Sequence, residues 1–109
     1  MKVHELNPED ICYVILLSPT KEDRRDMNII RDHVKHLQEL ERNGQLIMCG
    51  PFSDCPGGMV IVKAGSRDEA VHLAEKDPYV RSGIRSYEVR TWTLSHEGNG
   101  HLGIVPFQE

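Results

Sequence analysis

Residues 45–63, QLIMCGPFSDCPGGMVIVK, decide the fold of this chain. Gln45–Gly50 and Met59–Lys63 are short apolar runs of strand length, and the segment between them is rich in Gly and Pro. Two such runs around a turn predict a β-hairpin. Because this hairpin stands in the middle of the chain, the elements on its two sides determine the topology.

A strand and then a helix are predicted before the hairpin. Ile11–Leu17 (ICYVILL) is a continuous apolar, β-branched run, typical of a buried strand. A helix follows as far as about Asn43, with Thr20 or a nearby Asp as its cap. Gly44 is suited to end that helix, because glycine adopts the left-handed conformation found there.

A second helix and a last strand are predicted after the hairpin. Ser66–Lys76 forms the helix, and Ser66 with Glu69 matches a capping box. Pro78 ends this helix, since the residue before a proline is pushed out of the α region. Pro78–Gly83 is a further short helical turn, and Tyr87–Leu94 is a strand with alternating polarity.

The resulting order, βαββαβ, predicts an α+β, ferredoxin-like fold with a four-stranded antiparallel sheet in the strand order 4-1-3-2. Right-handed crossovers place both helices on one face. The first three strands are apolar at nearly every position, although a sheet with one face in water should alternate. The open face is therefore expected to pair with a second copy as a homodimer; the alternative is that the C-terminal tail covers it.

Composition predicts one domain, residues 1–109. The net charge of −4, with scattered Lys and Arg, argues against nucleic-acid binding. No apolar run approaches the roughly 20 residues of a membrane span, and the N-terminus lacks the apolar stretch of a signal peptide. The three unpatterned cysteines, Cys12, Cys49 and Cys55, fit free thiols in a reducing compartment, so the protein is expected in the cytoplasm.

Two polar residues interrupt the apolar faces of the helices. At roughly 100° per residue, His33 falls between Leu37 and Leu40 on the apolar arc of the first helix. Asp77 continues the apolar stripe of the second helix, to which Leu73 belongs. The helices run antiparallel in this topology, so the two side chains can hydrogen-bond.

Two interpretations of His33 and Asp77 remain open from the pattern. A carboxylate facing an imidazole fixes its tautomer, and such a histidine acts as a general base or acid near neutral pH. Alternatively, a buried histidine is a satisfied core residue, and an Asp before Pro is a common helix N-cap.

The chain resembles the YCII-related (YciI-like) family in two ordered motifs. The first is HVKHLQELERNGQLIMCGP, from His33 to Pro51, and the second is SRDEA followed by DPYVRSG, from Ser66 to Gly83. A closing strand that ends near Trp92 completes the resemblance, which covers about residues 11–94 and leaves 95–109 as a C-terminal extension.

This resemblance implies a dimeric α+β barrel with His33 and Asp77 as an active-site dyad. A few relatives are dehydrochlorinases, and the fold is similar to that of muconolactone isomerase. The expected function is therefore metal-free acid–base catalysis, of a lyase or isomerase kind, on a small cyclic or aromatic-derived molecule. The alternative is a module that binds or senses a small metabolite without catalysis. No cofactor is expected.

Further residues near this site are candidates for contact with a ligand. The Gly50-Pro51 turn is expected to close the cleft, and the Ser82 hydroxyl to hydrogen-bond a ligand. Many family members carry an Arg three residues before the His. Here that position is Ile30, and Arg31, one place away, is the candidate for substrate contact.

Metal and thiol chemistry are disfavoured. His33 and His36 have the spacing of metal ligands on a helix, but no Cys or carboxylate completes a set. Cys49 is expected to be a small buried hydrophobe rather than a nucleophile, because nucleophilic cysteines need an activating neighbour.

Overall fold

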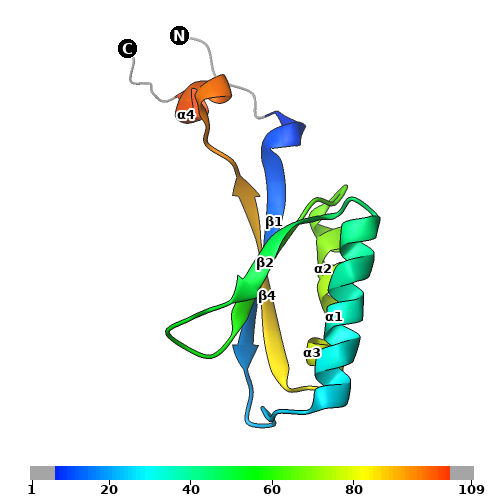
Figure 1. The fold of residues 1–109 in the computed structure, drawn as a ribbon. Coiled ribbons are helices and arrows are strands. Elements are labelled where there is room, and N and C mark those ends of the chain that lie inside the picture. The colour runs from blue at the N-terminus through cyan, green and yellow to red at the C-terminus, as the bar shows by residue number, and fades with distance from the viewer. Residues whose placement is uncertain (1–6, 104–109) are drawn as a thin grey trace.

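The computed structural model describes residues 7–103 and contains the predicted βαββαβ order, framed by short helical turns (Figure 1). The strands are β1 (Ile11–Pro19), β2 (Leu46–Pro51), β3 (Gly58–Val62) and β4 (Arg85–Thr93). The helices are α1 (Met27–Arg42), α2 (Arg67–Glu75), α3 (Pro78–Arg81) and α4 (Gly100–Gly103), and η1 (Pro8–Asp10) and η2 (Glu97–Asn99) are single 3₁₀ turns.

The sheet has the order β2-β3-β1-β4, and all three strand pairs are antiparallel. Central strand β1 pairs with both neighbours, so that Tyr13 lies opposite Val62 on β3 and Thr91 on β4. α1, α2 and α3 all lie on one side of this sheet (Figure 1). The predicted ferredoxin-like fold and strand order are confirmed.

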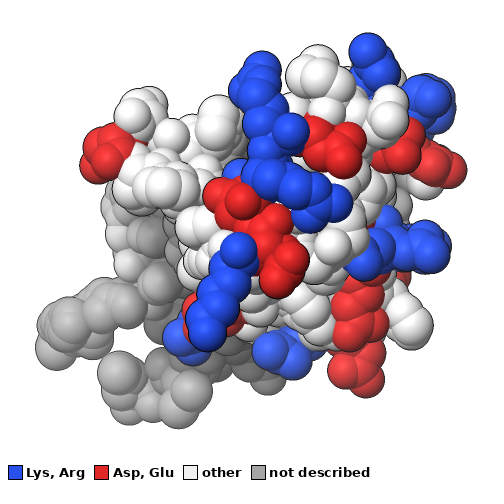
Figure 2. Space-filling model, turned by 90° about the horizontal axis from the view of Figure 1, so that it is seen from below, with Lys and Arg blue, Asp and Glu red and all other residues white. Residues whose placement is uncertain are grey.

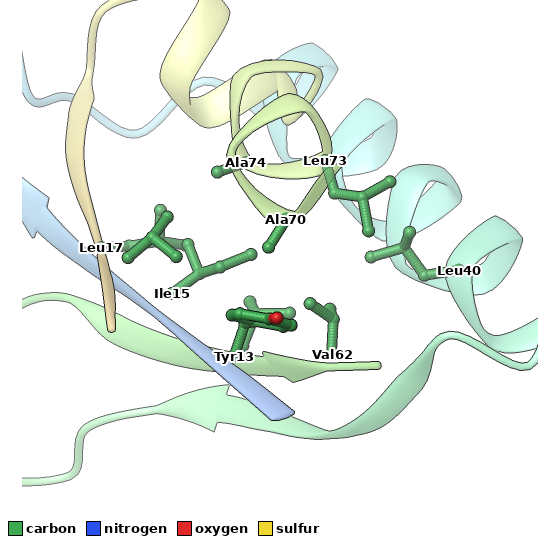
Figure 3. Close-up of a cluster of buried hydrophobic side chains, with 10 residues drawn as sticks. Tyr13, Ile15, Leu17, Leu40, Val62, Ala70, Leu73 and Ala74 are labelled. Carbon is green, nitrogen blue, oxygen red and sulfur yellow. The ribbon is translucent and has the colours of Figure 1, made fainter. Parts of the chain in front are cut away.

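The core lies between the sheet and the helices (Figure 3). Every second residue of β1 points into it, because side chains alternate along a strand. These residues pack against the apolar stripe of α2 and against the C-terminal half of α1. The labelled members are Tyr13, Ile15, Leu17, Leu40, Val62, Ala70, Leu73 and Ala74.

Helix α1 begins later than the sequence predicts. Asp26 is its N-cap and accepts hydrogen bonds from the backbone N–H groups of Asn28 and Ile29. The Thr20 hydroxyl instead donates to the carbonyl of Gly83 at 2.6 Å. That contact holds the segment after β1 against the start of β4, so the chain turns before it becomes helical.

The cap of α2 is the predicted one, with one difference. The Ser66 hydroxyl accepts from the N–H of Glu69 at 3.1 Å. The Glu69 carboxylate accepts from the N–H of Gly65 at 2.8 Å, one residue before the partner that a capping box requires. The two side chains still satisfy exposed donors at the start of the helix.

The sheet face opposite the helices is apolar on β1, β2 and β3, whereas β4 adds Glu88 and Arg90 opposite Leu16 and Val14. Val14 and Leu16 alternate with the core residues of β1, and the pairing places Ile61 beside Val14. At its edges Met48 is 61% exposed and Trp92 is 46% exposed. The described residues therefore leave an apolar surface over the first three strands, bordered by an exposed Glu88–Arg90 ion pair on β4.

The described part of the C-terminal extension is attached near the start of β1. His96 Nε2 lies 2.8 Å from Asp10 Oδ1, and the Asn99 amide donates to the other oxygen of that carboxylate at 3.1 Å. These hydrogen bonds lower the pKa of Asp10. The last residues of the C-terminal tail, the alternative cover for the open sheet face, lie outside the described residues. Within residues 7–103, no helix has the length and hydropathy of a membrane span.

The hairpin turn next to β3 depends on Gly57, which predicts a large effect of Gly57→Ala. Its φ is +103°, and a Cβ there would stand 2.4 Å from the carbonyl oxygen of Leu17. We expect Gly57→Ala to lower the free energy of unfolding, measured by urea denaturation, by about 3 kcal/mol. Alanine is strained at this positive φ, and the backbone must also shift to relieve the clash with Leu17. Gly44→Ala is the matched control: its φ is +74°, nothing lies within 4 Å, and about 1 kcal/mol is expected. Equal costs for the two variants would contradict the steric argument.

Candidate active site

His33 and Asp77 are in direct contact between α1 and the start of α3. His33 Nδ1 lies 2.8 Å from Asp77 Oδ1. The His33 side chain is 12% exposed and that of Asp77 is 4% exposed. Two polar side chains that helical phase places on inward faces thus meet across 44 residues of sequence.

The local sequence explains how Asp77 reaches this position. It follows the end of α2 and precedes Pro78, and its backbone is extended (φ −65°, ψ 126°), as a residue before proline prefers. Pro78 occupies the first turn of α3, where its missing N–H costs nothing. The Asp77 carboxylate caps this turn by accepting from the N–H of Tyr79 at 2.9 Å.

These contacts determine the tautomer of His33. An ionised carboxylate only accepts hydrogen bonds, so Nδ1 of His33 carries the proton that it shares with Asp77. Nε2 makes no hydrogen bond to any residue between 7 and 103. Since no buried side-chain nitrogen in that range lacks a partner, Nε2 is accessible to solvent and available to accept a proton.

Tyr79 forms a layer against the imidazole. The rings of His33 and Tyr79 are stacked with their centroids 3.8 Å apart and an interplanar angle of 10°. On β4, the guanidinium carbon of Arg85 lies 5.2 Å from the centroid of the Tyr79 ring, within the range of a cation–π contact. Tyr79 therefore contacts both the imidazole and a cation.

A pocket of about 420 Å³ opens beside His33. Its walls are mostly apolar, and His33, Tyr79 and Arg85 bring the polar groups. Such a volume suits a small-molecule ligand. The remaining lining residues come from α1, from β1 and from the hairpin: Leu17, Leu37, Cys49, Gly50, Pro51, Gly57, Gly58, Met59 and Val60.

The sequence-predicted binding residues divide into two groups. Gly50 and Pro51 line the pocket, as expected for a turn that closes it. Arg31 does not line it; this side chain is exposed, and its guanidinium donates to Asn28 at 3.2 Å. Ser82 does not line it either, and its hydroxyl donates to the carbonyl of Tyr79 at 3.3 Å.

Two pocket residues were not singled out from the sequence. Tyr79 follows Asp77-Pro78 directly, so a cap at Asp77 necessarily brings it to the site; that signal was present. Arg85 carries no such signal, because its approach to Tyr79 depends on the pairing of β4 with the end of β1.

The thiol and the second histidine near the pocket are poorly suited to chemistry. Cys49 is exposed, not buried as the sequence predicts, because it lies on the edge strand β2. Desolvation still raises the pKa of its thiol, and the Glu41 carboxylate adds to the effect, so the reactive thiolate is disfavoured. Burial lowers the pKa of His36, more than Asp77 raises it. Within residues 7–103, no three His, Cys, Asp or Glu side chains are grouped as metal ligands.

Comparisons with known proteins agree with this fold. A family model described as the YCII-related domain matches residues 11–93. The uncharacterised protein YjpA of Bacillus subtilis (strain 168) is 30% identical over 82 residues, which are 75% of this chain and 96% of that protein. A solved structure, the 5-chloro-2-hydroxyhydroquinone dehydrochlorinase TftG of Burkholderia phenoliruptrix AC1100 in complex with 2,5-dihydroxybenzoquinone, has a TM-score of 0.58 at 22% identity and covers 75% of this chain and 93% of its own.

Proposed function

The chain belongs to the YCII-related family, and from this premise we propose that it is an acid–base enzyme that acts on a small cyclic or aromatic-derived molecule. His33 is the proposed base and acid. Asp77 is the proposed positioning residue, which holds the imidazole by Nδ1. The observation that carries the proposal is that Asp77 binds one ring nitrogen of His33 while the other is accessible beside a mostly apolar pocket.

The proposed chemistry is proton transfer. Nε2 of His33 removes a proton from the substrate, and the imidazolium that forms is stabilised by the Asp77 carboxylate. The electron pair left on the substrate either expels a leaving group such as chloride, which is an elimination, or recovers a proton at another carbon, which is an isomerisation. The mostly apolar walls of the pocket lower the local polarity and so strengthen the electrostatic interactions within it.

The class of substrate follows from the pocket and from the structural relative. A space of about 420 Å³ with apolar walls accommodates a single substituted ring. TftG acts as a dehydrochlorinase and is bound to a dihydroxybenzoquinone, so hydroxylated, chlorinated rings are the first substrates to try.

Two further parts of the proposal concern assembly and location. A homodimer through the apolar sheet face, with each of two YCII-related domains (residues 1–109) carrying its own pocket, would cover Met48 and Trp92. A cytoplasmic location fits three cysteines without a disulfide.

The test combines binding and turnover. We expect 2,5-dihydroxybenzoquinone to shift the amide resonances of His33 and Tyr79 in an NMR titration while those of Arg90 stay unchanged. We expect chloride release from 5-chloro-2-hydroxyhydroquinone or from another ring in a panel of hydroxylated chloroaromatics. Binding at the pocket with no turnover across the panel would favour a module that only binds or senses a metabolite. Neither binding nor turnover would contradict both functions.

A further inference from the structure

Arg85 is the cation at the edge of the pocket, and only part of its guanidinium is used by the protein. Nη1 pairs with Asp23 and donates to the carbonyl of Ile84 at 3.1 Å. Nη2 and Nε of Arg85 make no hydrogen bond to residues 7–103. No buried side-chain nitrogen in that range is without a partner, so these two donors of Arg85 are open to solvent.

A second pocket, of about 270 Å³, lies on the other side of the same residues. Tyr79 and Arg85 line both pockets. The second pocket is also lined by Arg24 and Arg25, against one carboxylate, Asp23. Arg85 is paired with Asp23 and Arg24 with Asp26, so Arg25 is the cation of this pocket that has no ion pair within residues 7–103.

The segment that carries these charges is fixed in place. The N–H of Thr20 donates to the carbonyl of Ile84 at 3.2 Å, and its hydroxyl donates to Gly83. Arg24 is held by the carbonyl of Glu22, whereas Arg25 makes no ion pair within the described part of the chain. Figure 2 looks onto this end of the molecule, where charged side chains gather at the centre of the view.

We propose that Arg85 determines substrate specificity by binding a carboxylate on the ring whose proton His33 transfers. This inference rests on the proposed function and names its substrate class as small cyclic carboxylic acids. A guanidinium binds a carboxylate through parallel N–H donors, and Nη2 and Nε of Arg85 are such a pair. The charge of Arg25, which has no ion pair within residues 7–103, attracts an anion toward the same edge.

Asp23 favours a carboxylate over a phosphate at this position. The Asp23 carboxylate already offsets the charge of Arg85, so attraction to this pair does not grow with the charge of the anion, whereas the cost of removing the anion from water does. A carboxylate brings one negative charge, whereas a phosphate monoester brings about 1.5 to 2 at neutral pH.

The experiment compares ligands that differ only in this charge. The affinity of the full chain is measured by calorimetry for 2,5-dihydroxybenzoate, for its methyl ester and for the phenyl phosphate analogue of the ring. We expect the acid to bind about tenfold more tightly than the ester or more, and more tightly than the phosphate. The preference should weaken as salt is added.

Variants locate the effect. Arg85→Gln should bring the affinity for the acid down to that for the ester, and Arg85→Lys, which keeps the charge without the fork, should lie between. Arg42→Gln, at an exposed position in the last turn of α1 that lines neither pocket, is the control and should leave the acid-to-ester ratio unchanged. Any of four results overturns the proposal. In the wild type these are equal affinities for the acid and the ester, binding of neither compound, or tighter binding of the phosphate. In Arg85→Gln it is an unchanged acid-to-ester ratio.

His33→Asn separates this inference from the function on which it rests. It should abolish turnover but keep the acid-to-ester ratio. Turnover that survives in His33→Asn contradicts the proposed function and leaves the ratio as an independent test of Arg85.

Discussion

His33→Asn is expected to lower turnover by about 10²- to 10⁴-fold, the usual contribution of a positioned general acid or base. The asparagine amide can take the place of Nδ1 and donate to Asp77, so the contact between α1 and α3 survives. It has no counterpart of Nε2, which is the atom open to the pocket. The measurement is kcat of wild type and variant on the ring found to be turned over, with circular dichroism to show that both are folded.

Asp77→Asn removes the same activity by a different route. The asparagine oxygen still accepts from the N–H of Tyr79 and caps α3. That oxygen also accepts from Nδ1 of His33, because both hydrogen bonds of Asp77 go to Oδ1. What Asp77→Asn removes is the negative charge, which stabilises the imidazolium that forms when Nε2 takes up a proton. Asp77→Ala should in addition destabilise the fold by about 2 kcal/mol, because it deletes the cap and leaves the Nδ1 proton without an acceptor.

His36→Asn is the matched control for these variants, one turn further along α1. Burial lowers the pKa of His36, and it does not line the pocket, so activity should change by only a few-fold. If His33→Asn and Asp77→Asn both keep full turnover, the hydrogen bond serves only to tie the helices together. That outcome is the structural interpretation that the sequence pattern leaves open.

The fold and the inward orientation of His33 can be predicted from the sequence, because both depend on local periodicity. Alternation and β-branched runs indicate the four strands, and helical phase turns His33 inward with Leu37 and Leu40. Ser66 and Asp77 can be recognised as helix caps for the same reason. A short polar side chain just before a helix accepts a hydrogen bond from the first N–H groups of that helix. These patterns extend over a few residues, so they can be recognised without knowing which other segment of the chain packs against them.

The rest of the site depends on contacts between segments distant in sequence. Thr20 has the chemistry of a helix cap, but its hydroxyl donates a hydrogen bond to the carbonyl of Gly83, 63 residues away. Arg31 and Ser82 have the right chemistry for ligand contact, yet the orientation of the first and the hydrogen bond of the second point away from the pocket. Arg85 lies in the pocket because β4 pairs with β1 in the register that places Arg85 opposite Pro19, and the sequence alone does not indicate this register.

The apolar sheet face predicts that a double substitution, Met48→Lys with Trp92→Lys, abolishes the proposed homodimer. Both side chains are large, apolar and exposed, as expected of residues that a partner covers. Large apolar side chains that act as hot spots of an interface contribute about 2 kcal/mol or more each, so the pair should raise the dissociation constant by roughly 10³-fold. Sedimentation equilibrium measures it.

The control for the dimer is Met27→Lys with Val34→Lys on α1. These residues are exposed to a similar extent, 48% and 43%, on the helical side of the sheet, so the same gain of charge should leave the dissociation constant unchanged. A wild-type chain that sediments as a monomer, or a Met48→Lys, Trp92→Lys variant that stays dimeric, contradicts the proposed interface.

Loss of the dimer should also weaken ligand binding, because one hairpin serves both surfaces. Gly50, Pro51 and Met59 line the pocket beside His33, and they also line a shallow depression on the open face together with Met48. A partner packed on that face would restrain the hairpin from behind, so a monomeric variant loses a rigid wall of its pocket. We therefore expect Met48→Lys with Trp92→Lys to raise the dissociation constant for 2,5-dihydroxybenzoquinone, whereas the α1 control keeps the wild-type value. Unchanged affinity in a monomeric variant would show that each pocket is complete within one chain.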